Sequence, residues 1–184
     1  MTDYIFTSAR LGFRNWRRED LPPMAAINSD AAVMAYFPAI LSAAETSAFI
    51  QRMQELYSKK GYCYFAVDKL ERGKFIGFIG LSEQTFASDF TPCIDIGWRL
   101  KQSDWGKGYA TEGARACLNF AFNQLGLEKV VAIAPKVNLS SVAIMQKIGM
   151  EWVRDFQHPR LMQDRRLADC VLYAISRAAY NTMR

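Results

Sequence analysis

The feature that most restricts the fold of this chain is a long amphipathic helix that begins directly after a glycine-containing loop, residues 101–108. Apolar residues recur at relative positions 0, 4, 7, 8, 11, 12 and 15, which places all of them on one helix face. They are Ala110, Ala114, Cys117, Leu118, Ala121, Phe122 and Leu125. Gly126 then ends the pattern, as glycine commonly does at a helix C-terminus. The opposite face is polar, so the helix should cover another layer of structure with one side only.

Alternating apolar residues and glycine or proline breaks predict the other elements. We expect strands at 10–17, 62–68, 74–82, 92–100, 129–134, 150–157 and 167–177. We expect helices at 20–28, 31–36, 43–60 and 139–148. The predicted apolar face of the 43–60 helix consists of Ala44, Ala48, Phe49, Met53, Leu56 and Tyr57. The last two strands should pair with each other. This order predicts an α/β (α+β) fold, a mixed sheet of about seven strands flanked by helices in one domain, residues 1–184.

Composition and charge argue against some classes of protein. A chain of 184 residues suits one domain with a sizeable core. The net charge of +5 is modest, and the basic clusters, Arg14, Arg17 and Arg18 near the start and 165–166 near the end, are short. Nucleic-acid binding is therefore a weak alternative, and the charge equally suits a polyanionic cofactor. No apolar run reaches the length of a membrane span, and the start does not resemble a signal peptide, so we expect a cytoplasmic protein.

The cysteine and histidine pattern argues against a metal site. Cys63, Cys93, Cys117 and Cys170 are scattered without a Cys-x-x-Cys pair, and His158 is the one histidine. We expect no metal and four reduced thiols that are mostly buried.

The turn before the long helix has the composition of a phosphate-binding site. Trp105-Gly106-Lys107-Gly108-Tyr109-Ala110 lies between a predicted strand and a predicted helix. Glycines let successive backbone N–H groups face one anion, and the helix N-terminus adds partial positive charge. A dinucleotide fingerprint is excluded because Thr111 stands where its third glycine is needed, and no Walker motif occurs. The alternative is a glycine turn that simply joins strand to helix.

Several phrases in order resemble the GNAT acetyltransferase superfamily. The turn W-G-K-G-Y-A-T-E resembles its coenzyme A loop, Q/R-x-x-G-x-G/A, with Trp105 in the place of Gln or Arg. The tryptophan variant is typical of the branch resembling the ribosomal-protein N-terminal acetyltransferases RimJ and RimL. Residues 95–100 resemble that branch's E-I-G-W/Y-x-L strand. Residues 138–150 resemble its N-x-x-S … K-x-G-F segment. The resemblance covers about residues 10–175.

The resemblance implies the GNAT fold, with a mostly antiparallel sheet that splays after the strand ending at Leu100. Pantetheine would bond to the backbone of Trp98 and Leu100 in the gap, as an added strand does. The pyrophosphate would lie on Gly106, Lys107, Gly108, Tyr109 and Ala110. Asn138 would bond to the pantetheine arm, although its sequence position also fits an ordinary helix N-cap.

The implied activity is direct transfer of an acetyl group from acetyl-CoA to a primary amine in a ternary complex. Three residues are candidates for the catalytic proton transfers: Asp95 on the splayed strand, Ser141 in the N-x-x-S phrase, and His158 between the last two strands. Each has a structural alternative, namely a strand-end salt bridge, a helix cap and a loop histidine. Glu83 and Tyr109 are lesser candidates.

The acceptor stays open between a protein N-terminus and a small-molecule amine. The segments 31–41 and 84–91 should line its site, and they hold few charges apart from Asp89, which argues weakly against a strongly cationic acceptor. The alternatives to an enzyme are a CoA-binding sensor or partner protein without turnover, and a nucleic-acid or ribosome-surface module. Dimers are common in the branch that the chain resembles, so a homodimer is possible.

Overall fold

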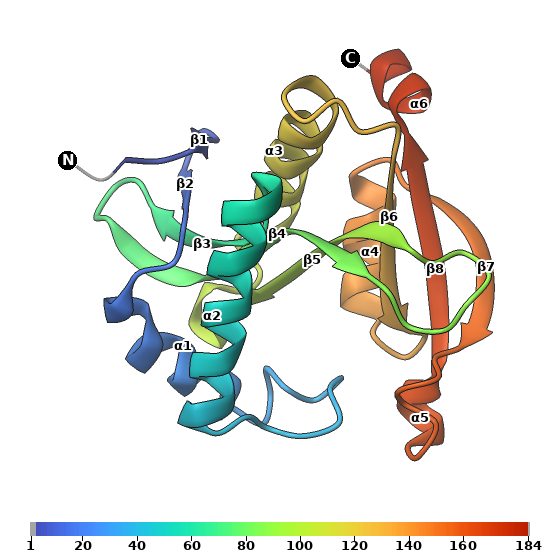
Figure 1. Ribbon diagram of the computed structural model, residues 1–184, viewed down its shortest axis with the longest axis horizontal. Helices are drawn as coiled ribbons and strands as arrows, with labels where there is room; N and C mark the ends of the chain where they lie inside the picture. Colours follow the sequence, from blue (N-terminus) through green and yellow to red (C-terminus); the bar gives the residue numbers. More distant parts are fainter. Residues whose placement is uncertain (1–2, 184) are drawn as a thin grey trace.

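The computed structural model describes residues 3–183, which form one open sheet flanked by helices (Figure 1). The sheet has eight strands in the order β1-β2-β3-β4-β5-β6-β8-β7. In chain order these are β1 Phe6–Thr7, β2 Leu11–Arg14, β3 Tyr64–Lys69, β4 Lys74–Gln84, β5 Cys93–Leu100, β6 Lys129–Pro135, β7 Glu151–Gln157 and β8 Asp169–Ser176. Neighbouring strands pair antiparallel except β5 and β6, which are parallel. The mixed, mostly antiparallel sheet is thus confirmed.

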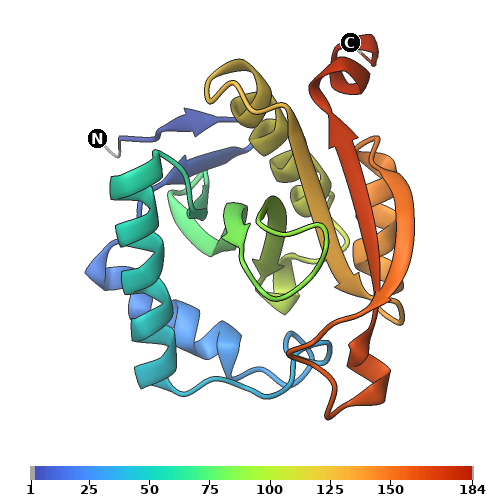
Figure 2. The same ribbon diagram turned by 45° about the vertical axis from the view of Figure 1, so that its right-hand side comes forward.

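The helices lie on both faces of the sheet (Figures 1 and 2). They are α1 Leu21–Asn28, α2 Ala43–Lys60, α3 Tyr109–Asn123, α4 Leu139–Lys147, α5 Arg165–Ala168 and α6 Arg177–Thr182, with 3-10 turns at Arg18–Asp20 and Gln102–Asp104. Phe49 of α2 packs against Phe78 of β4, whereas a Cβ on Gly113 of α3 would lie 2.3 Å from Ile79. Phe78 and Ile79 point to opposite faces because they are consecutive in a strand. Consequently α2 and α3 cover opposite faces.

At three places in or beside the sheet, the structure differs from the sequence prediction. The eighth strand is β1, which pairs with β2 over two residues and is too short to give an alternating pattern. Residues 167–168 are the end of α5, so the last strand begins at Asp169. The helix α6 was not predicted; the side chain of Ser176 caps it by accepting a hydrogen bond from the N–H of Ala179.

Two helix predictions need correction. Residues 31–36 form turns, because the segment is short, Pro38 follows it, and within it only Val33 and Met34 are buried. The bounds 43–60 of α2 are confirmed, and Phe49, Met53, Leu56 and Tyr57 of its predicted apolar face pack on the core, but the first part of the helix differs. Ala44 and Ala48 are exposed, and the buried residues are Thr46, Ile50 and Met53.

A buried ion-pair network joins the N-terminal part of the chain to the sheet. Arg14 of β2 donates to both carboxylate oxygens of Asp20, at 2.7 and 2.8 Å, and of Asp68, at 2.7 and 2.9 Å. All three residues are at most 5% exposed. Arg14 is therefore a structural residue and not part of a basic surface. None of the helices in the described part of the chain is both long and apolar enough to cross a bilayer.

Candidate active site

The site is built where the two parallel strands separate. β5 and β6 share a single register pair, Asp95 with Val131. Beyond it, the rest of β5 towards Leu100 has no paired residue on β6. α3 follows β5 and α4 follows β6, so both helices begin near the carboxyl ends of these strands (Figure 2). Crevices at the carboxyl ends of diverging parallel strands are common ligand sites. The predicted splay is thus present.

The glycine turn has the backbone of an anion-binding site. Gly106 and Gly108 have φ values of +72° and +79°, which favour glycine. α3 begins at Tyr109 with Gly108 as its N-cap and without a side-chain cap. The N–H groups of its first turn have no carbonyl partner inside the helix and can bind an anion there. The residues present therefore fit a pyrophosphate group.

Side chains of the turn hold it against the end of β5. The indole Nε1 of Trp105 donates to the carbonyl of Leu100 at 2.9 Å, so this residue acts through its side chain as well as its backbone. Lys107 donates to the carbonyl of Ser103 at 2.7 Å and lies 3.5 Å from the buried Asp104 carboxylate. Asp104 also accepts a hydrogen bond from Lys69 at 3.0 Å. The Lys107 ammonium is thus already paired inside the turn.

Asn138 and Ser141 lie at the start of α4, across the splay from the glycine turn. The Oδ1 atom of Asn138 accepts hydrogen bonds from the backbone N–H of Ser141 at 3.1 Å and from the Ser140 hydroxyl at 2.8 Å. Asn138 is therefore an N-cap, as one sequence interpretation held. Its amide Nδ2 has no acceptor among residues 3–183, so a ligand can still use it.

Asp95 lies at the vertex of the splay and is 7% exposed. Its Oδ1 atom accepts hydrogen bonds from the Tyr64 hydroxyl at 2.7 Å and from Gln84 Nε2 at 3.1 Å. Oδ2 has no donor within the described range. Burial raises the pKa of Asp95 to about 6, although the two hydrogen bonds act in the opposite direction. The salt-bridge alternative is excluded, because neither partner is a cation.

The Tyr64 hydroxyl reaches Asp95 because Gly97, which has no side chain, lies between them. Tyr64 of β3 crosses β4 at Gly80 and lies over Gly97 of β5, where a Cβ atom would come within 3.0 to 3.2 Å of the Tyr64 ring. Only a residue without a side chain leaves this path open. Tyr64 and Gln84 were not predicted from sequence, because their contact with Asp95 depends on strand register.

Arg99 is a half-buried charged group on the same face of β5 as Asp95. Its guanidinium lies 4.0 Å from the Phe37 ring centroid and 5.4 Å from that of Phe78, and its Nη1 donates to Asn28 Oδ1 at 2.6 Å. Burial lowers the pKa of Arg99 to about 10, so it remains a cation at neutral pH. Phe37 belongs to the segment 31–41, which was expected to line the acceptor site.

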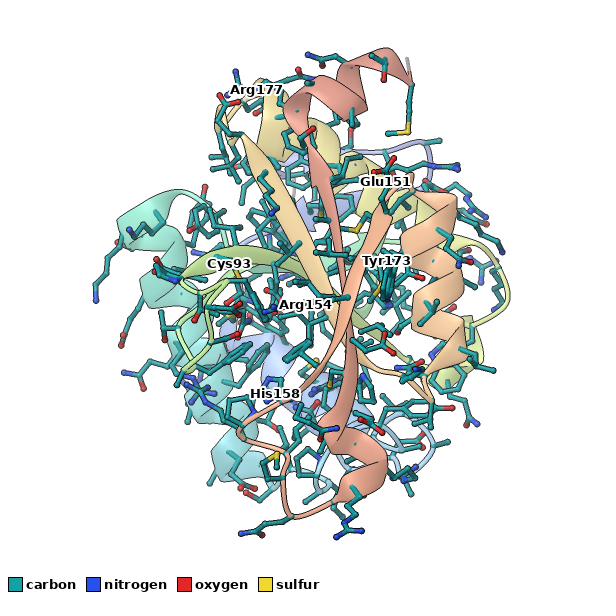
Figure 3. All side chains as sticks on the ribbon, turned by 90° about the vertical axis from the view of Figure 1, so that its right-hand side faces the viewer. Cys93, Glu151, Arg154, His158, Tyr173 and Arg177 are labelled. Carbon is teal, nitrogen blue, oxygen red and sulfur yellow. The ribbon has the colours of Figure 1, made fainter. Side chains whose placement is uncertain are left out.

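His158 follows the end of β7 and lies in an aromatic cluster (Figure 3). Its ring centroid is 4.4 Å from that of Phe86 and 6.0 Å from that of Phe156. Nδ1 accepts a hydrogen bond from the backbone N–H of Arg160 at 3.2 Å, so the proton of the neutral imidazole lies on Nε2. Burial, and then the positive charge of Arg160, lowers the pKa of His158. The histidine is thus neutral at pH 7, and its lone pair is already engaged.

The other predicted residues are distributed as follows. Tyr109 starts α3, and the Arg10 guanidinium lies 4.5 Å from its ring centroid. Glu83 is exposed and alternates with Ser82 and Gln84, so it points away from the face that carries Asp95. Asp89 is ion-paired with Arg154 of β7, which fixes the 84–91 loop against that strand.

Comparison with known proteins assigns the family. The protein-family model described as acetyltransferase (GNAT) domain matches residues 10–151, and the chain belongs to this family. It is accordingly an N-acyltransferase. A curated relative, the uncharacterized protein YkkB of Bacillus subtilis, is 30% identical over 144 residues, which are 75% of this chain and 81% of the relative.

Solved structures share the fold. An acetyltransferase of the GNAT family from Bacillus anthracis has a TM-score of 0.79 at 24% identity, with 94% of this chain and 98% of that chain covered. Spermidine N-acetyltransferase from Vibrio cholerae, in complex with CoA and spermine, has a TM-score of 0.74 at 18% identity, with 94% and 99% covered. The predicted GNAT fold is confirmed.

Proposed function

We propose that this protein transfers an acetyl group from acetyl-CoA directly to a primary amine, in a ternary complex without an acyl-enzyme. The observation that carries the proposal is the uncapped N-terminus of α3, with its two positive-φ glycines, at the mouth of the β5–β6 splay. The spermidine N-acetyltransferase of the same fold, whose structure contains CoA, supports acetyl-CoA as the co-substrate.

In this proposal the pyrophosphate binds to the first-turn N–H groups around Gly106–Ala110, and pantetheine bonds to the free edge of β5 at Trp98 and Leu100. The Leu100 carbonyl keeps one lone pair beside its bond from Trp105. Asn138 donates to the pantetheine arm through Nδ2. Lys107 contributes mainly by holding the turn through Asp104.

Asp95 is the proposed proton acceptor. An amine attacks a thioester only in its neutral form, and an ordinary lysine-like amine is neutral in about one molecule per 10³ to 10⁴ at pH 7. Asp95 has a pKa of about 6 and is mostly ionised at pH 7. Its Oδ2 atom can accept the amine proton directly or through one water molecule. The geometry favours Asp95 over His158, whose Nδ1 atom is occupied.

The remaining steps use hydrogen-bond donors. Ser141 is the proposed donor to the departing CoA thiolate, because its hydroxyl has no partner among residues 3–183. Cysteine catalysis is disfavoured, because burial raises the pKa of Cys93 to about 11 and holds the pKa of Cys117 well above its ordinary value, so neither forms a thiolate readily. Trapping of an acetyl-cysteine, or ping-pong kinetics, would contradict direct transfer.

The acceptor is a small-molecule amine or a protein N-terminus. Membership of the branch around RimJ and RimL rests on the Trp105 turn and the N-x-x-S phrase, and it would favour a protein N-terminus. A cytoplasmic location and a homodimer stay predictions, which fractionation and light scattering can test. Binding of nucleic acid is disfavoured because Arg14 of the basic N-terminal cluster is buried between two carboxylates.

The test is thermal denaturation with acetyl-CoA, free CoA, NAD and ATP, followed by an acetyl-transfer assay on an amine panel. A ligand at 100 times its Kd stabilises the native state by about 2.7 kcal/mol, which corresponds to about 5–10 °C here. A shift with the two CoA species together with turnover supports the proposal. A shift without turnover on any amine favours a CoA-binding sensor. No shift with CoA refutes the proposal, and a salt-dependent shift of RNA would then favour the nucleic-acid module.

A further inference from the structure

Arg99 carries a positive charge without a counter-ion among residues 3–183. Its Nε is the one side-chain nitrogen or oxygen in the described residues that is buried without a hydrogen-bond partner. Nη2 likewise has no acceptor there, but unlike Nε it is not a buried atom, and Nη1 binds Asn28. No carboxylate among residues 3–183 forms an ion pair with Arg99. A buried N–H donor without an acceptor is unfavourable for folding, so the unpaired Nε of Arg99 needs a structural explanation.

The fully buried arginine, Arg14, shows how this chain satisfies a structural guanidinium. Arg14 is surrounded by the carboxylates of Asp20 and Asp68 and uses Nε, Nη1 and Nη2. Arg99 has one neutral partner, Asn28, which itself donates to Thr46 at 3.0 Å. The contrast indicates that the Nε and Nη2 edge of Arg99 is kept for a group that the protein chain does not supply.

The surroundings of Arg99 define what that group is. The guanidinium packs on the rings of Phe37 and Phe78, and a hydrogen-bonding partner would approach its N–H edge in the guanidinium plane. The Nε and Nη2 donors form a fork that matches the two oxygens of a planar carboxylate. Phe37 is 36% exposed and lies in the turn segment between α1 and α2, so this side of the Arg99 guanidinium is close to the protein surface.

We propose that Arg99 binds a carboxylate carried by the acceptor amine, an inference that rests on the proposed acetyl transfer. Asp95 and Arg99 share a strand face four residues apart, so their Cα atoms are separated by about 13 Å, and the Tyr64 ring lies over Gly97 between them, so an acceptor has to extend past this ring. Their side chains span only part of that distance. The acceptor therefore separates its amine from its carboxylate by several bonds, as in an ω-amino carboxylic acid. A polycation such as the spermine bound to the Vibrio cholerae structure is disfavoured by the Arg99 charge.

The first experiment compares matched acceptors that differ only in charge. Amines from 3-aminopropanoate to 6-aminohexanoate are assayed with acetyl-CoA beside their carboxamides. The wild-type protein should prefer at least one carboxylate by about 10- to 100-fold in kcat/KM, mainly through KM, as expected for a charge-assisted hydrogen bond. Arg99→Gln should abolish the preference, and Arg99→Lys should keep a small part of it because it retains the charge without the fork.

Arg52→Gln is the matched control, because it removes one positive charge from an exposed position on α2. It should leave the preference unchanged. The thermal shift caused by CoA should be the same in all variants, which shows that each is folded and binds the co-substrate. Equal use of carboxylates and carboxamides by the wild type, or a preference that survives Arg99→Gln, overturns the inference.

A binding experiment separates this inference from the proposed function. The N-acetylated forms of the same amino carboxylates are titrated calorimetrically into the CoA-bound protein, which requires no turnover. Binding that is lost in Arg99→Gln but kept in Arg52→Gln supports the carboxylate site even if no amine is acetylated, in which case only the transfer proposal fails. Absence of binding to the wild type, beside an intact CoA shift, refutes the carboxylate site alone.

Discussion

Replacement of Asp95 by asparagine should stabilise the protein while it removes activity. The carboxyl is buried, and its pKa rises from 3.8 to about 6 on folding, which corresponds to about 3 kcal/mol. A raised pKa means that the folded state prefers the protonated form. The stabilisation is therefore fully present below about pH 4 and is lost as the pH rises through 6. Asparagine is neutral at every pH and can still accept hydrogen bonds from Tyr64 and Gln84, so it avoids this loss.

The assay is thermal denaturation of wild type and Asp95→Asn between pH 3.5 and 8. The two proteins should have similar Tm values at the acid end, and the variant should be more stable by up to about 3 kcal/mol, or about 6–12 °C, above pH 7. Acetyl transfer should fall by about 10²- to 10⁴-fold, and the wild-type kcat/KM should rise with pH through about 6. A difference in Tm that does not change with pH would refute the reasoning on burial, and full activity in the variant would refute the role of Asp95.

Three further predictions concern the glycine turn and the buried ion pairs. Gly108→Ala places a side chain at φ +79°, at a cost of about 1–2 kcal/mol, and should weaken the CoA-dependent thermal shift more than it lowers the Tm of the free protein. Trp105→Phe removes the bond to the Leu100 carbonyl, worth about 1 kcal/mol, and should raise KM for acetyl-CoA several-fold in steady-state kinetics with little change in kcat. Asp68→Ala leaves Arg14 with one carboxylate and should lower the free energy of unfolding by about 3–5 kcal/mol in urea titrations, whereas activity per folded molecule at low temperature should be unchanged.

Local patterns determined most of the elements. The apolar spacing of residues 110–125 predicted α3, and the glycine turn before it was recognisable because φ-permissive residues and a helix start are both local properties. The strands from β3 to β8 were found because alternation and turn residues are also local. The prediction of a helix at 31–36 was wrong, because an apolar run this short does not form a helix by itself when no other layer packs on it.

The candidate site depended on both kinds of information. The position of Asp95 on a strand before the glycine turn was readable from the order of motifs, and so was the N-cap position of Asn138. Sequence could not decide whether Asp95 or His158 is the proton acceptor, because the choice depends on the residues that surround each side chain in the folded protein. The hydrogen bond from Arg160 to His158 and the burial of Asp95 are products of chain packing.

The sequence by itself determined the family, the order of elements and the glycine turn, because each of these is written in short stretches of consecutive residues. Tertiary structure alone decided that Tyr64 and Gln84 meet Asp95, since strand register brings together residues that are 31 and 11 positions apart. It also decided that Arg14 has two carboxylate partners, whereas Arg99 has none in the described part of the chain. Whether a charge is compensated depends on which distant side chains surround it, and that is fixed only when the sheet and its covering helices assemble.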